Sequence, residues 1–338
     1  MNSQYLWEVG SRLLRASPED VVRGLLSSSV VCAVLGLVIA IVWTLIRKPR
    51  ETAPLVVGPR GERVGLGVIA LFVGAVWVLD IGLRGYVFDM SNTVSWWRFA
   101  VAPSIAAFGL GAWAVTRRTR EPRRVVDAGA VTRRTWTTFG PRRGILLFFV
   151  LIALAGSIAV VFGRMSTAFD SGIAAHVALP VPNTDVPPVV TIFPGWAYGI
   201  PLIVALAALG AATVLALSRN AVCAFPGNLS LDTERARRAG LARDVAAIAI
   251  AATLVSFAGL LRMARASAAT TIAATTDSGR VAVADVHLPH ADLILVGGLL
   301  APALEIAGCA LLALLVARGI LLVGARRVRS TSRPGVIA

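Results

Sequence analysis

Seven apolar runs, each close to twenty residues long, constrain this chain more than any other feature of its sequence. They cover approximately residues 25–46, 64–83, 96–115, 144–163, 196–217, 244–264 and 293–317. A bilayer core needs roughly 20 apolar residues in a helix, because lipid offers no partner to backbone N–H and C=O groups. Only 15% of the residues are charged, against roughly 25% in soluble proteins. We therefore predict an all-α membrane protein with seven transmembrane helices.

The charges between these runs predict the orientation of the chain. Segments 47–63, 116–143, 218–243 and the tail from Arg318 hold 24 of the 33 basic residues. Segment 116–143 is the most basic, with nine arginines against two acids. Because basic loops stay in the cytoplasm, we predict an N-out/C-in topology in the cell inner (plasma) membrane. Anionic lipid and this topology explain the net charge of +15 without nucleic acid binding.

The two ends of the chain differ from the spans. Residues 1–24 mix apolar and charged side chains, and we predict that they form a helix at the membrane interface. Residues 17–20 read Ser-Pro-Glu-Asp, which is typical of a helix start. The first span lacks the flanks of a cleaved signal peptide, so we expect it to be kept as an anchor. Residues 25–324 form the seven-helix domain, and residues 325–338 form a basic cytoplasmic tail.

Two long connections on the outer side, residues 164–195 and 265–292, resemble each other. Each contains Asp-Ser-Gly and alternating small apolar and polar residues, a pattern that predicts strands. In the second loop, segments 270–275 and 280–286 flank the turn signal at 277–279, which predicts a hairpin. We expect both loops to form strands and to pack together as a small β-containing extracytoplasmic cap.

Glu305 is the one acid deep inside a predicted span, three residues after Pro302. An ionisable group in a bilayer is costly and is often functional. Glu305 could serve as a proton or cation site, or as a structural carboxyl that bonds a backbone group freed by the proline. The sequence leaves both open. Pro103, Pro201 and Pro302 predict kinks in three of the spans.

Three charged residues cluster near the outer ends of the second and third spans. Asp80 and Arg84 have i, i+4 spacing, and Arg98 begins the next span. This spacing is typical of a structural ion pair on a helix, and we predict an interfacial ion pair here.

All three histidines, His176, His287 and His290, fall in the two outer loops. A His-x-x-His pattern near carboxylates could bind zinc or copper in an oxidising compartment. Polar residues on the surface of a folded cap explain the same pattern, and short patterns of this kind are seldom true sites. Metal binding by these histidines is therefore a secondary hypothesis.

The sequence contains few motifs of known catalytic or cofactor-binding chemistry. No phosphate-binding loop is present, no histidine lies in a span, and the one lysine, Lys48, precludes a retinal-type Schiff base in the last span. We predict no cofactor and no enzymatic activity. The first hypothesis is a non-enzymatic accessory or permease-like subunit of a larger membrane complex, with loop 116–143 facing a membrane or cytoplasmic partner. The alternative is a secondary transporter or sensor of a small solute centred on Glu305.

Overall fold

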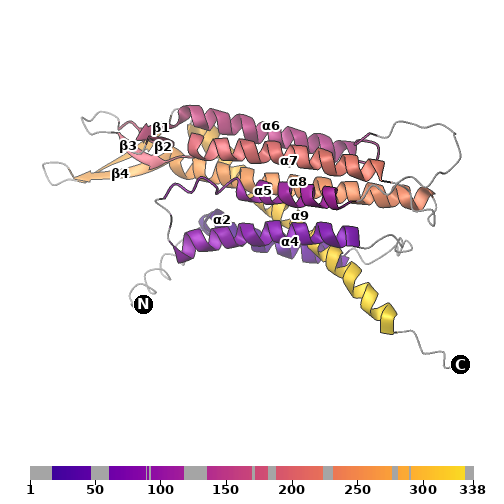
Figure 1. Cartoon of the computed structure of the whole chain (residues 1–338). Coiled ribbons are helices and arrows are strands. Elements are labelled where there is room, and N and C mark those ends of the chain that lie inside the picture. The colour runs from indigo at the N-terminus through magenta and orange to yellow at the C-terminus, as the bar shows by residue number, and fades with distance from the viewer. Residues whose placement is uncertain are drawn as a thin grey trace, which may run out of the picture.

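The helices of this protein form one bundle with short strands at one end (Figure 1). A computed structural model describes residues 17–46, 61–88, 90, 93–117, 135–169, 172–181, 188–223, 231–275, 281–288 and 291–331. The helices are α2 (Pro18–Ser27), α3 (Ser29–Ile46), α4 (Gly61–Gly82), α5 (Val101–Thr116), α6 (Arg142–Met165), α7 (Trp196–Val222), α8 (Leu231–Ala268) and α9 (Ala291–Thr331). A π-helical turn, η1 (Leu83–Val87), extends α4. The strands are β1 (Thr167–Phe169), β2 (Ile173–Leu179), β3 (Val189–Ile192), β4 (Ala269–Thr275) and β5 (Val281–His287).

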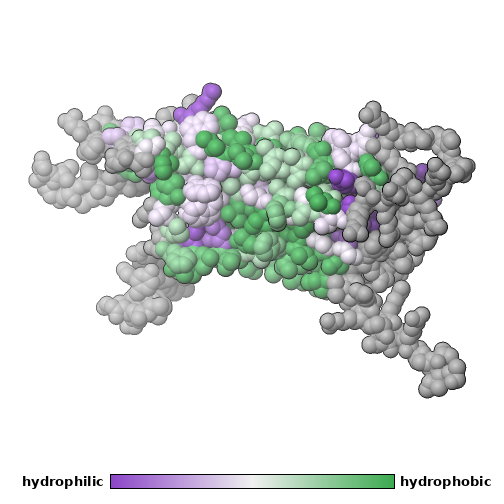
Figure 2. Space-filling model, viewed as in Figure 1, coloured by the Kyte–Doolittle hydropathy of each residue, from purple (hydrophilic) through white to green (hydrophobic). Residues whose placement is uncertain are grey.

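Within the described residues, six helices are long and apolar enough to cross a membrane, namely α3, α4, α6, α7, α8 and α9. Their outer surface is apolar across the middle of the bundle and more hydrophilic toward both ends (Figure 2). This is the architecture of a helical multi-pass membrane protein, as the sequence predicts. The run at 96–115 gives α5, which has only 16 residues because residues 96–100 form turns. The count of seven spans and the N-out orientation stay predictions.

Helix α8 is the centre of the bundle. Helices α4, α5, α6, α7 and α9 all pack against it. Its small side chains make this possible, since Ala249, Ala251 and Ala252 have no exposed surface and small residues let helix backbones approach closely. The other element that organises the fold is α9, which crosses the bundle obliquely (Figure 1) and holds α3 at its edge.

The predicted strands in both long connections are confirmed. Strands β1, β2 and β3 form an antiparallel sheet in that order, and β4 and β5 form a separate antiparallel hairpin. The two strands lie where the sequence predicts them, and residues 276–280 between them lie outside the described residues. Both sheets lie at the same end of the bundle (Figure 1). Ser267 Oγ, at the end of α8, donates to the carbonyl of Ile192 in β3 and so links the two connections.

Several helix ends differ from the approximate bounds of the predicted spans. Segment 218–243 was expected to be a loop, but α7 continues to Val222 and α8 begins at Leu231. The charged residues at the start of α8 stay helical because they pair with one another along the helix. Helix α3, which corresponds to the first predicted span, begins at Ser29 rather than at residue 25. Helix α2 continues to Ser27, and Ser28 between the two is not helical.

The expected helix start near residue 18 is confirmed, since α2 begins at Pro18. Residues 1–16 of the predicted interfacial helix lie outside the described residues, as does the tail from 332. Pro201 and Pro302 lie inside α7 and α9. Pro103, in contrast, does not lie in the middle of a helix, although the sequence predicts a kink there. It is the third residue of α5, where the missing N–H has no partner to lose within the helix.

Candidate functional site

The buried carboxylate of Glu305 has an arginine partner that the sequence did not indicate. Glu305 lies in α9 and is 1% exposed. Nη2 of Arg262, on α8, donates a hydrogen bond to its Oε2 and forms an ion pair with it. Arg262 lies within the predicted span 244–264, six residues before the end of α8. The pair neutralises both charges inside the apolar region.

Arg262 also caps the end of α2. Its Nη1 donates to the carbonyl oxygen of Leu26 at 2.9 Å and to that of Ser27. These carbonyls belong to the last turn of α2, where no intrahelical donor remains for them. Nη2 lies 3.5 Å from the sulfur of Cys32 in α3. One guanidinium therefore ties together α8, α9 and the junction of α2 with α3.

This geometry favours a structural role for Glu305 over a transport role. A proton or cation site needs access to water. Here the carboxylate of Glu305 is instead bound to the guanidinium of Arg262. Neither Glu305 nor Arg262 lines the α3–α4–α9 groove, the cavity between α4, α8 and α9, or the cavity between α6 and α7. The partner is not a backbone group freed by Pro302, as one of the two hypotheses held, but a cationic side chain.

Asp80 and Arg84 lie side by side in an ion pair near the end of α4. Nε of Arg84 lies 3.0 Å from both carboxylate oxygens, and each side chain is 13% exposed. Arg98 is not part of this pair. Its guanidinium lies over the ring of Phe99, 5.3 Å from the centroid, and 3.9 Å from the sulfur of Met263.

The histidines do not form a cluster among the described residues. His176 lies in β2, opposite Ile192 of β3, while His287 ends β5 in the other sheet. His290 lies outside the described residues. No group of three His, Cys, Asp or Glu side chains suited to a metal ion occurs in the part of the chain that the structure describes. The metal hypothesis keeps only its sequence basis.

A second charged cluster lies at the end of the bundle opposite the sheets. Glu234, in the first turns of α8, has no exposed surface. It accepts hydrogen bonds from Arg237 at 2.7 and 2.8 Å and from Arg238 at 2.8 Å. Arg238 in turn donates to the carbonyls of Ala221 at 2.9 Å and of Cys223, at the end of α7. The cluster therefore closes the connection between α7 and α8.

The same cluster reaches two further helices. Glu62, in the first turn of α4, pairs with Arg117 at 2.7 Å and with Arg237. Arg117 follows α5, lies over the ring of Trp113, and donates to Oδ1 of Asn220 at 2.7 Å. Burial lowers the pKa of Arg117. Segment 118–134 of the basic loop lies outside the described residues, so the structure does not test its docking role.

Sequence reasoning missed this cluster for a clear reason. Glu234, Arg237 and Arg238 have the i, i+3 and i, i+4 spacings of helix pairs, and this signal was available. The segment lies between two predicted spans, and the sequence analysis interprets it only as a basic connection. Glu62 and Asn220 lie far from the others in the sequence, and no local signal marks them.

An apolar groove opens between α3 and α4, with α9 as its floor. It has a volume of about 730 Å³ and is lined by parts of residues 29–44, 70–81 and 309–320. The only side-chain hydroxyls lining it, Ser29 and Thr44, lie near its two ends. At 1.5 Å per residue it extends over about 22 Å of helix. Seven of its 22 lining residues are Ala or Gly, namely Ala33, Ala40, Ala70, Gly74, Ala75, Ala313 and Ala317.

Glycines explain why the groove exists. A Cβ at Gly36 of α3 would lie 2.6 Å from Cβ of Cys309, and one at Gly67 of α4 would lie 3.3 Å from Cα of Gly319. Both helices therefore touch the backbone or inner side chains of α9. They contact each other little, so a furrow remains between them.

Comparison of the chain with protein-family models, with curated proteins and with solved structures finds no match.

Proposed function

We propose that this protein is a non-enzymatic subunit of a larger membrane complex and that the α3–α4–α9 groove receives a transmembrane helix of a partner protein. The proposal places the chain in the inner (plasma) membrane, with the N-terminus outside. The arginine-rich segment 116–143 then lies in the cytoplasm, where it offers a docking surface for an acidic partner.

The groove is the observation that carries this proposal. It runs along most of the apolar length of α3, and its middle has no charged lining residue. A path for a polar solute would need polar groups along its wall, and this wall lacks them. Transmembrane helices associate through small residues that allow close backbone contact, and each of the three helices contributes at least two Ala or Gly residues to this groove.

The rival hypothesis of a transporter or sensor centred on Glu305 has less support. Its central carboxylate is buried against Arg262, and neither residue lines the groove. Mild extraction of the native protein, followed by mass spectrometry, is the first test. A stoichiometric membrane partner supports the proposal, and a clean single species contradicts it.

Cross-linking locates the contact. A photoreactive amino acid at Leu37 of α3 or at Leu71 of α4, both half-exposed in the groove, should join the chain to one protein of discrete mass. Leu154 on α6 and Val204 on α7 are similarly exposed elsewhere and are the matched controls. Cross-links to lipid alone, or equal yields at all four positions, contradict the proposal.

A substitution that fills the groove provides a functional test. A Cβ at Gly74 meets only Leu312 Cδ1, at 3.8 Å, so Gly74→Leu should fold normally and displace the partner. Gly156→Leu on α6, where nothing lies within 4 Å of an added Cβ, should retain the partner. Full recovery of the partner with Gly74→Leu would contradict this assignment of the groove.

A further inference from the structure

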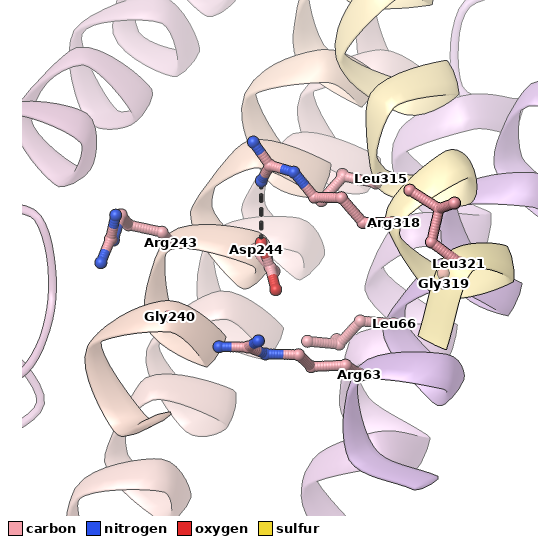
Figure 3. Close-up of a pocket in the computed structure, with 10 residues that line it drawn as sticks. Arg63, Leu66, Gly240, Arg243, Asp244, Leu315, Arg318, Gly319 and Leu321 are labelled. Carbon is pink, nitrogen blue, oxygen red and sulfur yellow. Dashed lines mark hydrogen bonds and ion pairs between the residues drawn. The ribbon is translucent and has the colours of Figure 1, made fainter. Parts of the chain in front are cut away.

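A separate cavity, lined by arginines, lies between α4, α8 and α9 at the end of the bundle opposite the sheets. Its volume is about 340 Å³, which is within the range of small-ligand sites. Figure 3 shows Arg63 from α4, Arg243 and Asp244 from α8, and Arg318 from α9 around it. Leu66 and Leu315 form its apolar wall. The cavity shares no residue with the α3–α4–α9 groove, so its role does not depend on the proposed function.

The charges of this cavity do not balance. Three arginines and one aspartate line the cavity, which leaves an excess of two positive charges. The carboxylate of Asp244 pairs only loosely, with 3.4 Å between its Oδ1 and Nη1 of Arg318. A strong bond between a guanidinium and a carboxylate is about 2.7–2.9 Å long. Arg318 therefore has nitrogens left for another acceptor. Arg243 forms no ion pair among the described residues and points away from Asp244 in Figure 3.

Arg63 is the residue that most clearly needs an acceptor. Its guanidinium lies against Gly240 of α8, where any Cβ would overlap Nη2. Gly240 thus lets the side chain cross from α4 into the cavity. Nε of Arg63 is buried and has no hydrogen-bond partner among the described residues. A buried donor without an acceptor is unfavourable, and a guanidinium offers five N–H groups to a ligand with several oxygens.

We propose that this cavity binds a phosphate group, either in the headgroup of an anionic lipid or in a soluble phosphate compound. Arg63 and Arg318 hold its oxygens from two sides, and Arg243 turns in from the rim. Arginine suits this ligand because its planar fork matches two phosphate oxygens at once. Asp244 orients Arg318 through one nitrogen and limits affinity by its negative charge.

Binding of defined probes to the purified full chain tests this proposal. The protein is placed in nanodiscs of phosphatidylcholine and titrated with inorganic phosphate and glycerol 3-phosphate. In a second arm, nanodiscs containing phosphatidylglycerol are compared with phosphatidylcholine alone. The readouts are the apparent melting temperature and the amount of lipid retained in native mass spectrometry. Binding in the first arm identifies a soluble ligand, and binding in the second arm alone identifies a lipid headgroup. Binding in neither arm overturns the proposal.

Substitutions assign the binding to this cavity. Arg63→Gln and Arg318→Gln should each weaken binding at least about ten-fold, the loss expected for one charge-assisted contact. Arg235→Gln is the control, because Arg235 lies near the same end of α8 with its side chain 67% exposed. Asp244→Asn should strengthen binding several-fold by removing repulsion, a gain that misfolding cannot produce. Equal losses in Arg63→Gln and Arg235→Gln, or weaker binding in Asp244→Asn, would refute the site.

Discussion

The ion pair between Arg262 and Glu305 gives the sharpest prediction on stability. Arg262→Met and Glu305→Leu remove each charge while keeping much of the side-chain volume. Arg262→Met leaves the carboxylate of Glu305, which is 1% exposed, without its partner. This should lower the free energy of unfolding by about 3–5 kcal/mol. Glu305→Leu leaves the guanidinium of Arg262 without its carboxylate, but the carbonyl oxygens of Leu26 and Ser27 still accept from it. The free energy of unfolding should therefore fall by less, about 2–3 kcal/mol.

The double variant should be less destabilised than the sum of the two single variants. With both charges gone, the remaining loss is the uncapped end of α2, about 1–2 kcal/mol. We expect a coupling energy of at least about 2 kcal/mol. Unfolding in mixed micelles, followed by the fluorescence of the eight tryptophans, measures all four states of the cycle.

An exposed pair on the same helix calibrates this cycle. Asp232 and Arg235 are 93% and 67% exposed, and their coupling should be below about 0.5 kcal/mol. If the buried pair couples no more strongly than this exposed one, Arg262 and Glu305 do not stabilise each other and the structural interpretation of Glu305 fails.

Two further predictions concern packing and the second charged cluster. Gly36→Leu should detach α3 from α9, because the new Cβ would lie 2.6 Å from Cβ of Cys309. Limited proteolysis should then cleave the chain near α3 faster than in the wild type. The control Gly156→Leu should be cleaved at the wild-type rate. Glu234→Gln should lower the free energy of unfolding by about 2–4 kcal/mol, because two buried guanidiniums lose their carboxylate. Asp232→Asn, on the same turn but exposed, should leave stability within about 0.5 kcal/mol, and a loss equal to that of Glu234→Gln would contradict the buried role of Glu234.

Local features of the chain were predictable because their causes are local. Apolar runs form helices since lipid leaves the backbone no other way to satisfy its hydrogen bonds. Pro18 starts a helix and the 277–279 turn signal brings two strands together for reasons that lie within a few residues. The third run shows the limit of this reasoning, since its first residues form turns and α5 has only 16 residues.

The helical, multi-pass membrane character of the protein and the position of its strands follow from the sequence alone. The sequence also marked Glu305 as a carboxyl in need of a partner. Only the tertiary structure decided that this partner is Arg262, that Glu62 pairs with Arg117 and Arg237, and that a groove separates α3 from α4. The pair between Glu62 and Arg237 joins residues 175 positions apart. Such contacts depend on which helix faces pack together, and helices with small, uniformly apolar faces do not encode that choice in their local pattern.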